Sequence, residues 1–131
     1  MNQNTLAILE YDRIVDRLKG YCVSNLGKYF CDRMKPLYEK NRVVEALAET
    51  TEAMIIVSAG GQPLQGLHDM RETLNMAEKG GILAPADLLR IADMLRGSAK
   101  FKRLMLGRRS EMPILWSYAA SIQELPGLIQ A

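Results

Sequence analysis

The chain has 131 residues, which suits one domain and is too short for two well-buried ones. Hydrophobic residues make up 48% and charged residues 24%, and the net charge is +2, so the composition excludes a disordered or fibrous protein. Two cysteines, Cys22 and Cys31, are too few for a disulfide scaffold or a zinc site and are interpreted as buried structural residues. With no signal-peptide pattern and no apolar run near the roughly 18 residues of a membrane span, we expect a cytoplasmic protein without a membrane partner.

Apolar residues recur at helical spacing through the first part of the chain, and strand-like alternation is scarce. A first helical segment from Leu6 to Cys22 contains Gly20, which predicts a bend or an end there. Ser24 is a good N-cap for a second helix. Pro36 stops that helix, because the residue before a proline is pushed out of the helical region.

A third helix is expected over residues 41–59, with one apolar side and one acidic side. The apolar stripe is predicted to face the core and consists of Val43, Val44, Leu47, Ala48, Met54, Ile55 and Ser58. The opposite side, formed by Glu45, Glu49 and Glu52, is predicted to be a solvated acidic face. Gly60 and Gly61 then end the helix, as glycines commonly do.

Three further helices are expected in the second half of the chain. Asp69 and Glu72 have the spacing of a capping box and predict a helix that starts at Asp69 and closes at the glycine pair 80–81. Pro85 is well placed as the first residue of a fifth helix that runs to about residue 106. A sixth is expected to start within residues 110–113 and to be ended by Pro126 and Gly127.

These elements predict an all-α fold, an irregular bundle of about six helices around an aliphatic core, in a single domain spanning residues 1–131. Leu128 and Ile129 begin an apolar pattern that breaks off at residue 131 without a polar tail. We therefore expect the chain to be a truncated piece of a longer protein.

Basic charge is concentrated in the basic run, residues 96–109, which contains no acidic residue; its cations are Arg96, Lys100, Lys102, Arg103, Arg108 and Arg109. Arg96, Lys100 and Arg103 are expected on one side of the fifth helix, about 90° from its apolar stripe, so that they remain in solvent. Positive charge there also suits the C-terminal end of a helix dipole. The run is either a solvated face or a contact for phosphates or an acidic partner, and any nucleic-acid contact would be to the backbone and strongly salt-dependent.

The only histidine, His68, lies in the loop between the third and fourth helices. Asp69 could orient its imidazole, but one histidine supplies neither a nucleophile nor a metal-ligand set. We therefore expect a structural turn formed by Gly60, Gly61, Gly66, His68 and Asp69, with a small hydrolase using His68 as the alternative. The chain also has no phosphate-binding loop motif. The sequence therefore predicts that this chain has no catalytic residue and binds no metal or cofactor of its own.

That loop carries the most specific motif of the chain, reading Gly-Gly-Gln-Pro-Leu-Gln-Gly-Leu-His-Asp-Met-Arg over residues 60–71. The pieces around it are Thr5-Leu6-x-Ile8-Leu9-Glu10-Tyr11-Asp12-x-Ile14, Ser24-x-Leu26-Gly27-Lys28, Lys35-Pro36-Leu37, Glu49-Thr50-x-Glu52-Ala53, Ala77-Glu78-Lys79-Gly80-Gly81-x-Leu83 and Leu88-Leu89-x-Ile91-Ala92. In this order they resemble the N-terminal region of the second branch of bacterial MutS proteins, which lacks the mismatch-reading domain.

The resemblance implies a non-catalytic core segment of an ATP-driven protein. Proteins of this branch are similar to MutS in their core and clamp helices and ABC-type ATPase, and they add a C-terminal Smr nuclease-like domain. They act as homodimers on branched DNA, suppressing recombination, and have been linked to splitting collided ribosomes. ATP and magnesium would bind outside this chain, and the implied partners are the remainder of its own chain and either DNA or a ribosome.

The alternative is a stand-alone helical module that binds nucleic acid or an acidic partner through the basic run. Salt-titrated binding distinguishes the two, because only the module depends on the cations Arg96, Lys100 and Arg103 for measurable affinity.

Overall fold

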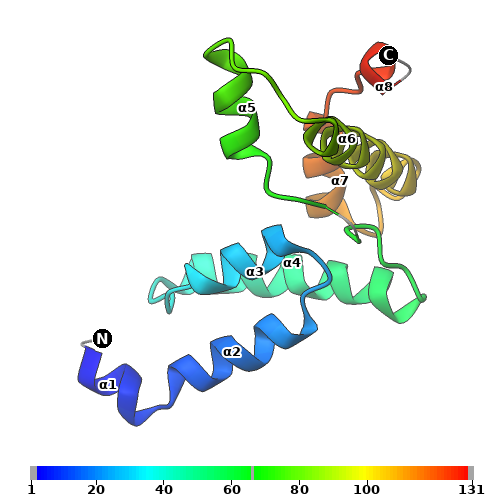
Figure 1. Cartoon of the computed structure of the whole chain (residues 1–131). Coiled ribbons are helices and arrows are strands. Elements are labelled where there is room, and N and C mark those ends of the chain that lie inside the picture. The colour runs from blue at the N-terminus through cyan, green and yellow to red at the C-terminus, as the bar shows by residue number, and fades with distance from the viewer. Residues whose placement is uncertain (1–2, 66, 130–131) are drawn as a thin grey trace.

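The computed structural model describes residues 3–65 and 67–129, and within these ranges it contains helices and no strand (Figure 1). The helices are α1 (Gln3–Ile8), α2 (Tyr11–Tyr21), α3 (Asn25–Asp32), α4 (Lys40–Ser58), α5 (Arg71–Glu78), α6 (Pro85–Met105), α7 (Pro113–Ser121) and α8 (Pro126–Ile129). Six of them have at least seven residues, which confirms the all-α prediction of about six helices. In Figure 1, α1 and α2 lie at one end, α3 and α4 cross the middle, and α6, α7 and α8 gather at the other end.

Several helix ends lie where local chemistry predicts them. The Ser24 hydroxyl accepts a hydrogen bond from the N–H of Gly27 at 3.0 Å, which confirms Ser24 as the N-cap of α3. Pro85 is the first residue of α6. After α4, Gly60 adopts φ 77° and donates to Val57 O, while Gly61 donates to Ile56 O. This is the Schellman pattern, and its left-handed residue favours glycine.

The predicted boundaries near the two ends of the chain are partly wrong. The first helix breaks at Glu10, which has φ 51°, because its N–H closes α1 on Ala7 O while its carbonyl accepts from Arg13 N and begins α2. Helix α2 then ends at Tyr21, one residue after Gly20, which confirms the end predicted there. The sixth predicted helix ends at Ser121, and Pro126 begins α8 instead of ending a helix, since proline fits a first helical position.

The prediction for the two sides of α4 is partly wrong. Ile55 of the stripe packs against the core, Val43 and Ala48 are half-buried, and Glu45 is exposed as expected. Val44, Leu47 and Met54, expected in the core, are 57%, 61% and 61% exposed. Glu52, expected in solvent, is only 7% exposed and lies on the buried side with Ile56. Periodicity therefore located the apolar stripe but did not show that part of it is exposed and that Glu52 is buried.

The reason for the burial of Glu52 is the way α7 begins. Its N-cap residue, Met112, makes no side-chain capping bond, and Pro113 has no N–H to satisfy. The next two N–H groups, of Ile114 and Leu115, donate to the two carboxylate oxygens of Glu52 at 3.1 and 2.8 Å. Glu52 on α4 therefore caps α7 across the fold, and its negative charge lies at the positive end of the helix dipole.

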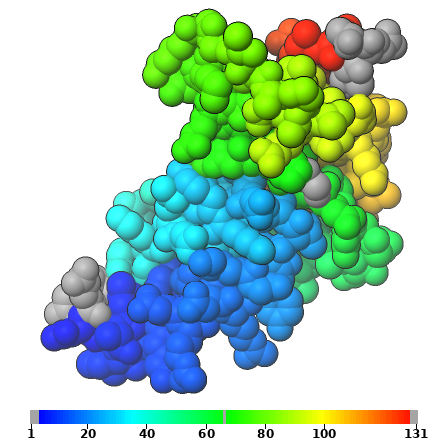
Figure 2. All heavy atoms as spheres, viewed as in Figure 1, coloured from blue at the N-terminus to red at the C-terminus, as the bar shows by residue number. Residues whose placement is uncertain are grey.

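The most deeply buried cluster joins α4, α6 and α7 and is small. It consists of Ile56, Met105, Met112 and Ala119, with Phe101, Leu115 and Trp116 among the half-buried residues around it. The accessible surface of the molecule is 10043 Å², against about 6,900 Å² for a compact monomer of this mass. Figure 2 shows the same open shape, with the N-terminal helices at one end and the C-terminal helices at the other.

Candidate functional site

The six cations of the basic run differ in what they contact. Arg96 pairs with Asp93 on its own helix at 2.7 Å, and Arg103 donates from Nε to Ala99 O at 3.3 Å. The Lys102 ammonium donates at 2.7 Å to the carbonyl of Ile122, which ends α7. Lys102 thus satisfies a helix C-terminus, where positive charge is favourable.

The two arginines beyond α6 lie close to α7. The Arg109 guanidinium lies over the Trp116 ring, with Cζ 4.6 Å from the ring centroid, which is a cation–π geometry. Arg108 is half-buried, and its N–H closes the turn after α6 on Met105 O. Gly107 supplies the φ of 80° at the third position of this turn.

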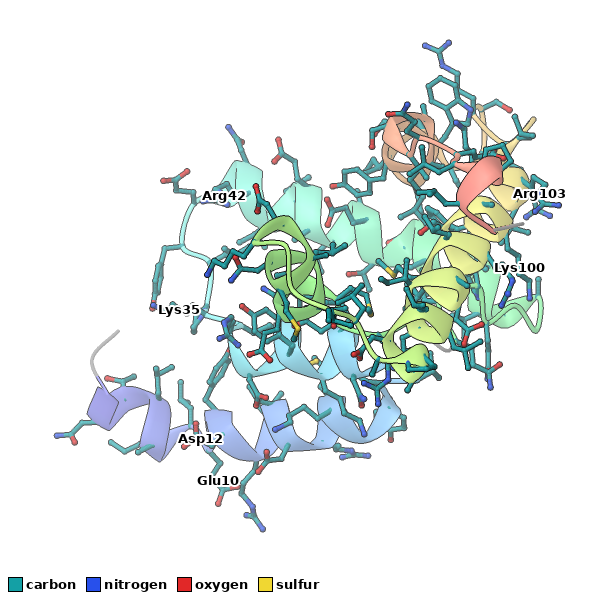
Figure 3. The ribbon with its side chains drawn as sticks, turned by 45° about the horizontal axis from the view of Figure 1, so that its top comes forward. Glu10, Asp12, Lys35, Arg42, Lys100 and Arg103 are labelled. Carbon is teal, nitrogen blue, oxygen red and sulfur yellow. The ribbon has the colours of Figure 1, made fainter. Side chains whose placement is uncertain are left out.

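Arg96, Lys100 and Arg103 remain at the surface, as helical spacing predicts. In Figure 3, Lys100 and Arg103 project from α6 on the opposite side of the molecule from Lys35 and Arg42. No hydrogen bond or ion pair involves the Lys100 ammonium within the described residues. That these cations contact a partner stays a prediction.

The 60–71 loop is fixed on α6 by one close packing contact. Leu67 is buried, and its Cδ2 lies where a side chain at Gly97 would be, 2.6 Å from an ideal Cβ. Gly97 therefore lets the loop lie directly on the helix. Gly66, predicted as a member of the structural turn, lies outside the described residues.

This contact brings the two regions singled out from the sequence together. Gln65 and His68 from the loop line one surface depression of about 310 Å³ with four residues of α6: Asp93, Arg96, Gly97 and Lys100. None of these residues is a serine, threonine or cysteine nucleophile, so the depression offers His68 no partner for nucleophilic catalysis. Within the described residues, no group of three histidine, cysteine or carboxylate side chains could hold a metal ion.

Asp69 binds Arg71 and does not form the predicted capping box, since α5 begins two residues later, at Arg71. Its carboxylate accepts from the Arg71 N–H at 3.2 Å and from Arg71 Nε at 2.8 Å. These hydrogen bonds from Arg71, first the side-chain bond and then the backbone bond, lower the pKa of Asp69 to about 2. The loop end therefore holds an ion pair that is already satisfied within the chain.

Arg71 also ties the loop to α3. Its Cζ lies 3.8 Å from the centroid of the Tyr29 ring, and Arg33 Cζ lies 3.5 Å from the same centroid. Both guanidinium groups therefore make cation–π contacts with the same ring. The hydrogen bond to Asp69 is the main cause that raises the pKa of Arg71, which keeps the guanidinium charged.

No protein-family model matches the chain. It is 40% identical over 104 residues to the endonuclease MutS2 of Clostridium kluyveri and 40% identical over 103 residues to that of Acetivibrio thermocellus. The endonuclease MutS2 of Clostridium acetobutylicum is 37% identical over 112 residues. These matches cover 79%, 78% and 85% of the chain.

The chain is homologous to a short segment of the MutS2 endonucleases. This confirms the resemblance stated from the sequence. The chain spans only 13–14% of the length of these relatives. Within the described residues, no helix is long and apolar enough to cross a membrane.

Three contacts in this MutS2-related segment were not predicted from the sequence. They are the Glu52 cap of α7, the contact of Leu67 with Gly97, and the stacking of two arginines on Tyr29. Only Gly97 gave a signal, because a glycine in the interior of a helix commonly marks a close approach. The other two depend on which helices become neighbours.

Proposed function

We propose that the chain is a non-catalytic helical core segment of a MutS2-type ATPase. In this proposal it links the state of a distant ATPase to the position of helices that grip DNA or a stalled ribosome. ATP, magnesium, the homodimer contacts and any nuclease centre belong to other parts of that protein, and the location is cytoplasmic. ATP hydrolysis by this chain above the buffer rate would contradict the proposal.

One observation carries the proposal: part of the apolar stripe of α4 is on the outside. Val44, Leu47 and Met54 follow one another along the exposed side of the helix, where water gives them no favourable contact. The accessible surface exceeds that of a compact monomer by about 3,000 Å², an area in the range of a large obligate interface. Such a surface fits a segment that packs against further parts of a larger protein.

The direct experiment is complementation between this chain and the rest of the Clostridium kluyveri MutS2 polypeptide, without the matching segment. We expect a complex in size-exclusion chromatography and titration calorimetry. Leu47→Asp should weaken it at least 10-fold, because docking buries a leucine worth roughly 1.5–3 kcal/mol and the variant would bury a charge instead. Leu47 is mostly exposed in the free chain, so its folding should be unaffected.

Arg42→Asp is the matched control, since it places the same side chain on the same helix about 140° away from Leu47. If both variants bind like the unchanged chain, or if no complex forms, the α4 stripe is not a docking face and the proposal is wrong.

The exposed cations Arg96, Lys100 and Arg103 favour the second candidate, a module that binds nucleic acid or an acidic partner. Under that hypothesis, changing all three to Glu reduces the affinity for a DNA duplex below the measurable range at physiological salt. At low salt, the slope of log affinity against log salt becomes shallower by about 3, because three cations are lost. Under the core-segment proposal, the unchanged chain binds the duplex weakly, without sequence preference.

A further inference from the structure

The two cysteines of the chain lie next to each other in the fold, although nine positions separate them. Cys22 ends α2, and Cys31 lies in the last turn of α3. Their sulfur atoms are 3.4 Å apart, in thiol–thiol contact, and both are free thiols. A disulfide bond needs about 2.05 Å, so the sulfurs must approach by roughly 1.4 Å, a distance that small side-chain rotations supply.

The surroundings hold the two thiols in this arrangement. Lys19 and Asp32 form an ion pair of 2.6 Å from α2 to α3 beside the cysteines. Ser24 caps α3 in the turn between them, and Gly27 of α3 lies beside the Cys22 side chain. The sulfurs are therefore juxtaposed by the helix pair itself.

The two thiols differ in exposure, which divides their roles. Cys31 is 7% exposed, and burial, with the contact to Cys22 as the second cause, raises the pKa of its thiol. Cys22 is half-buried and is the sulfur that a small oxidant reaches first. This is the arrangement of an attacking and a resolving cysteine.

We propose that Cys22 and Cys31 form a dithiol site that reacts with low-molecular-weight disulfides to give a reversible intrachain disulfide between α2 and α3. The Cys22 thiolate attacks one sulfur of the small disulfide and releases one thiolate. Cys31 then loses its proton and attacks the Cys22 sulfur, which releases the second thiolate. Two cysteine thiols are oxidised, and one small disulfide is reduced to two thiols.

The consequence concerns the N-terminal arm, α1 and α2. Helix α2 packs on α1 and α3, so the α2–α3 contact joins both N-terminal helices to α3. A disulfide at this contact fixes the arm covalently. Oxidation should slow amide hydrogen exchange in α2 and leave α7 unchanged.

The test is a glutathione redox titration of the native chain and of the same chain in concentrated guanidinium chloride, with alkylation and mass spectrometry. If the fold holds the two thiols together, the equilibrium constant for the intrachain disulfide should be about 100-fold larger in the folded chain than in the denatured chain. The denatured chain must first close a loop of ten residues, and that entropy cost corresponds to about this factor. Equal constants in the two conditions, or glutathione on both cysteines without an intrachain bond, would overturn the proposal.

Single variants test the division of roles. In Cys31→Ser, Cys22 should accept glutathione rapidly and retain it, because no second thiol can displace it. In Cys22→Ser, Cys31 should react at least 10-fold more slowly than Cys22 does, because it is buried. Circular dichroism checks that both variants fold, and equal rates in the two would refute the assigned order of attack.

Discussion

The cap that Glu52 places on α7 gives the sharpest prediction about stability. Glu52→Ala removes two charge-assisted hydrogen bonds, each worth about 1.5–3 kcal/mol, and the favourable charge at the start of the helix. Ile114 and Leu115 are half-buried, so water recovers part of this loss. We expect the free energy of unfolding to fall by about 2–4 kcal/mol.

Glu52→Gln should remove only part of this stabilisation. The amide oxygen can still accept one of the two hydrogen bonds, but its NH₂ group faces the other N–H, so the expected loss is about 1–2 kcal/mol. Glu45→Ala is the control on the same helix, since Glu45 is exposed, and it should change stability by less than about 0.5 kcal/mol.

Guanidinium chloride unfolding measures these differences, and amide hydrogen exchange locates them. A local loss of 2 kcal/mol corresponds to about 30-fold faster exchange at Ile114 and Leu115. If the free energy of unfolding of Glu52→Ala lies within about 0.5 kcal/mol of that of the unchanged chain and those two amides exchange as before, Glu52 does not cap α7. The explanation of its burial then fails.

Three other predictions concern the turns and the loop. The Asp69 carboxyl should titrate near pH 2 when its pKa is measured by NMR, and a midpoint near 3.8 would contradict the pairing with Arg71. The contribution of this carboxylate to stability is complete above pH 3.8 and is lost as the pH falls through about 2. Gly60→Ala should cost about 1–2 kcal/mol in denaturant unfolding because φ is 77°, whereas Gly20→Ala, inside α2 with open space around it, should stabilise by up to about 1 kcal/mol. Leu67→Ala should cost about 2–3 kcal/mol and speed exchange in the loop; no change would mean that the loop is not held on α6.

Helix ends were the most predictable part of the fold, because they depend on neighbouring residues only. Ser24, Pro85 and the glycine pair after α4 each act through a bond or a φ angle that a few residues determine. The break at Glu10 was missed, since a non-glycine residue in the left-handed region gives little signal in the sequence.

Packing between distant segments was less predictable. The acidic side of α4 reads as solvated in isolation, and only the arrival of α7, with its unsatisfied N–H groups, makes Glu52 an interior residue. The apolar side of α4 is typical of a core face, but within the described residues no helix covers Val44, Leu47 or Met54. The candidate surface follows the same rule. Spacing predicted exposed cations on α6 but not that Arg96 and Lys100 line one depression with His68.

Oxidative footprinting of Met54 tests the central proposal most directly. In the free chain Met54 is mostly exposed and should be oxidised readily by dilute peroxide, while the buried Met105 should be protected. In the complex with the rest of a MutS2 polypeptide, we predict at least 10-fold slower oxidation of Met54, with Met105 protected in both states. Equal oxidation rates of Met54 in the free chain and in the complex would contradict the proposal that α4 docks within a larger MutS2-type protein.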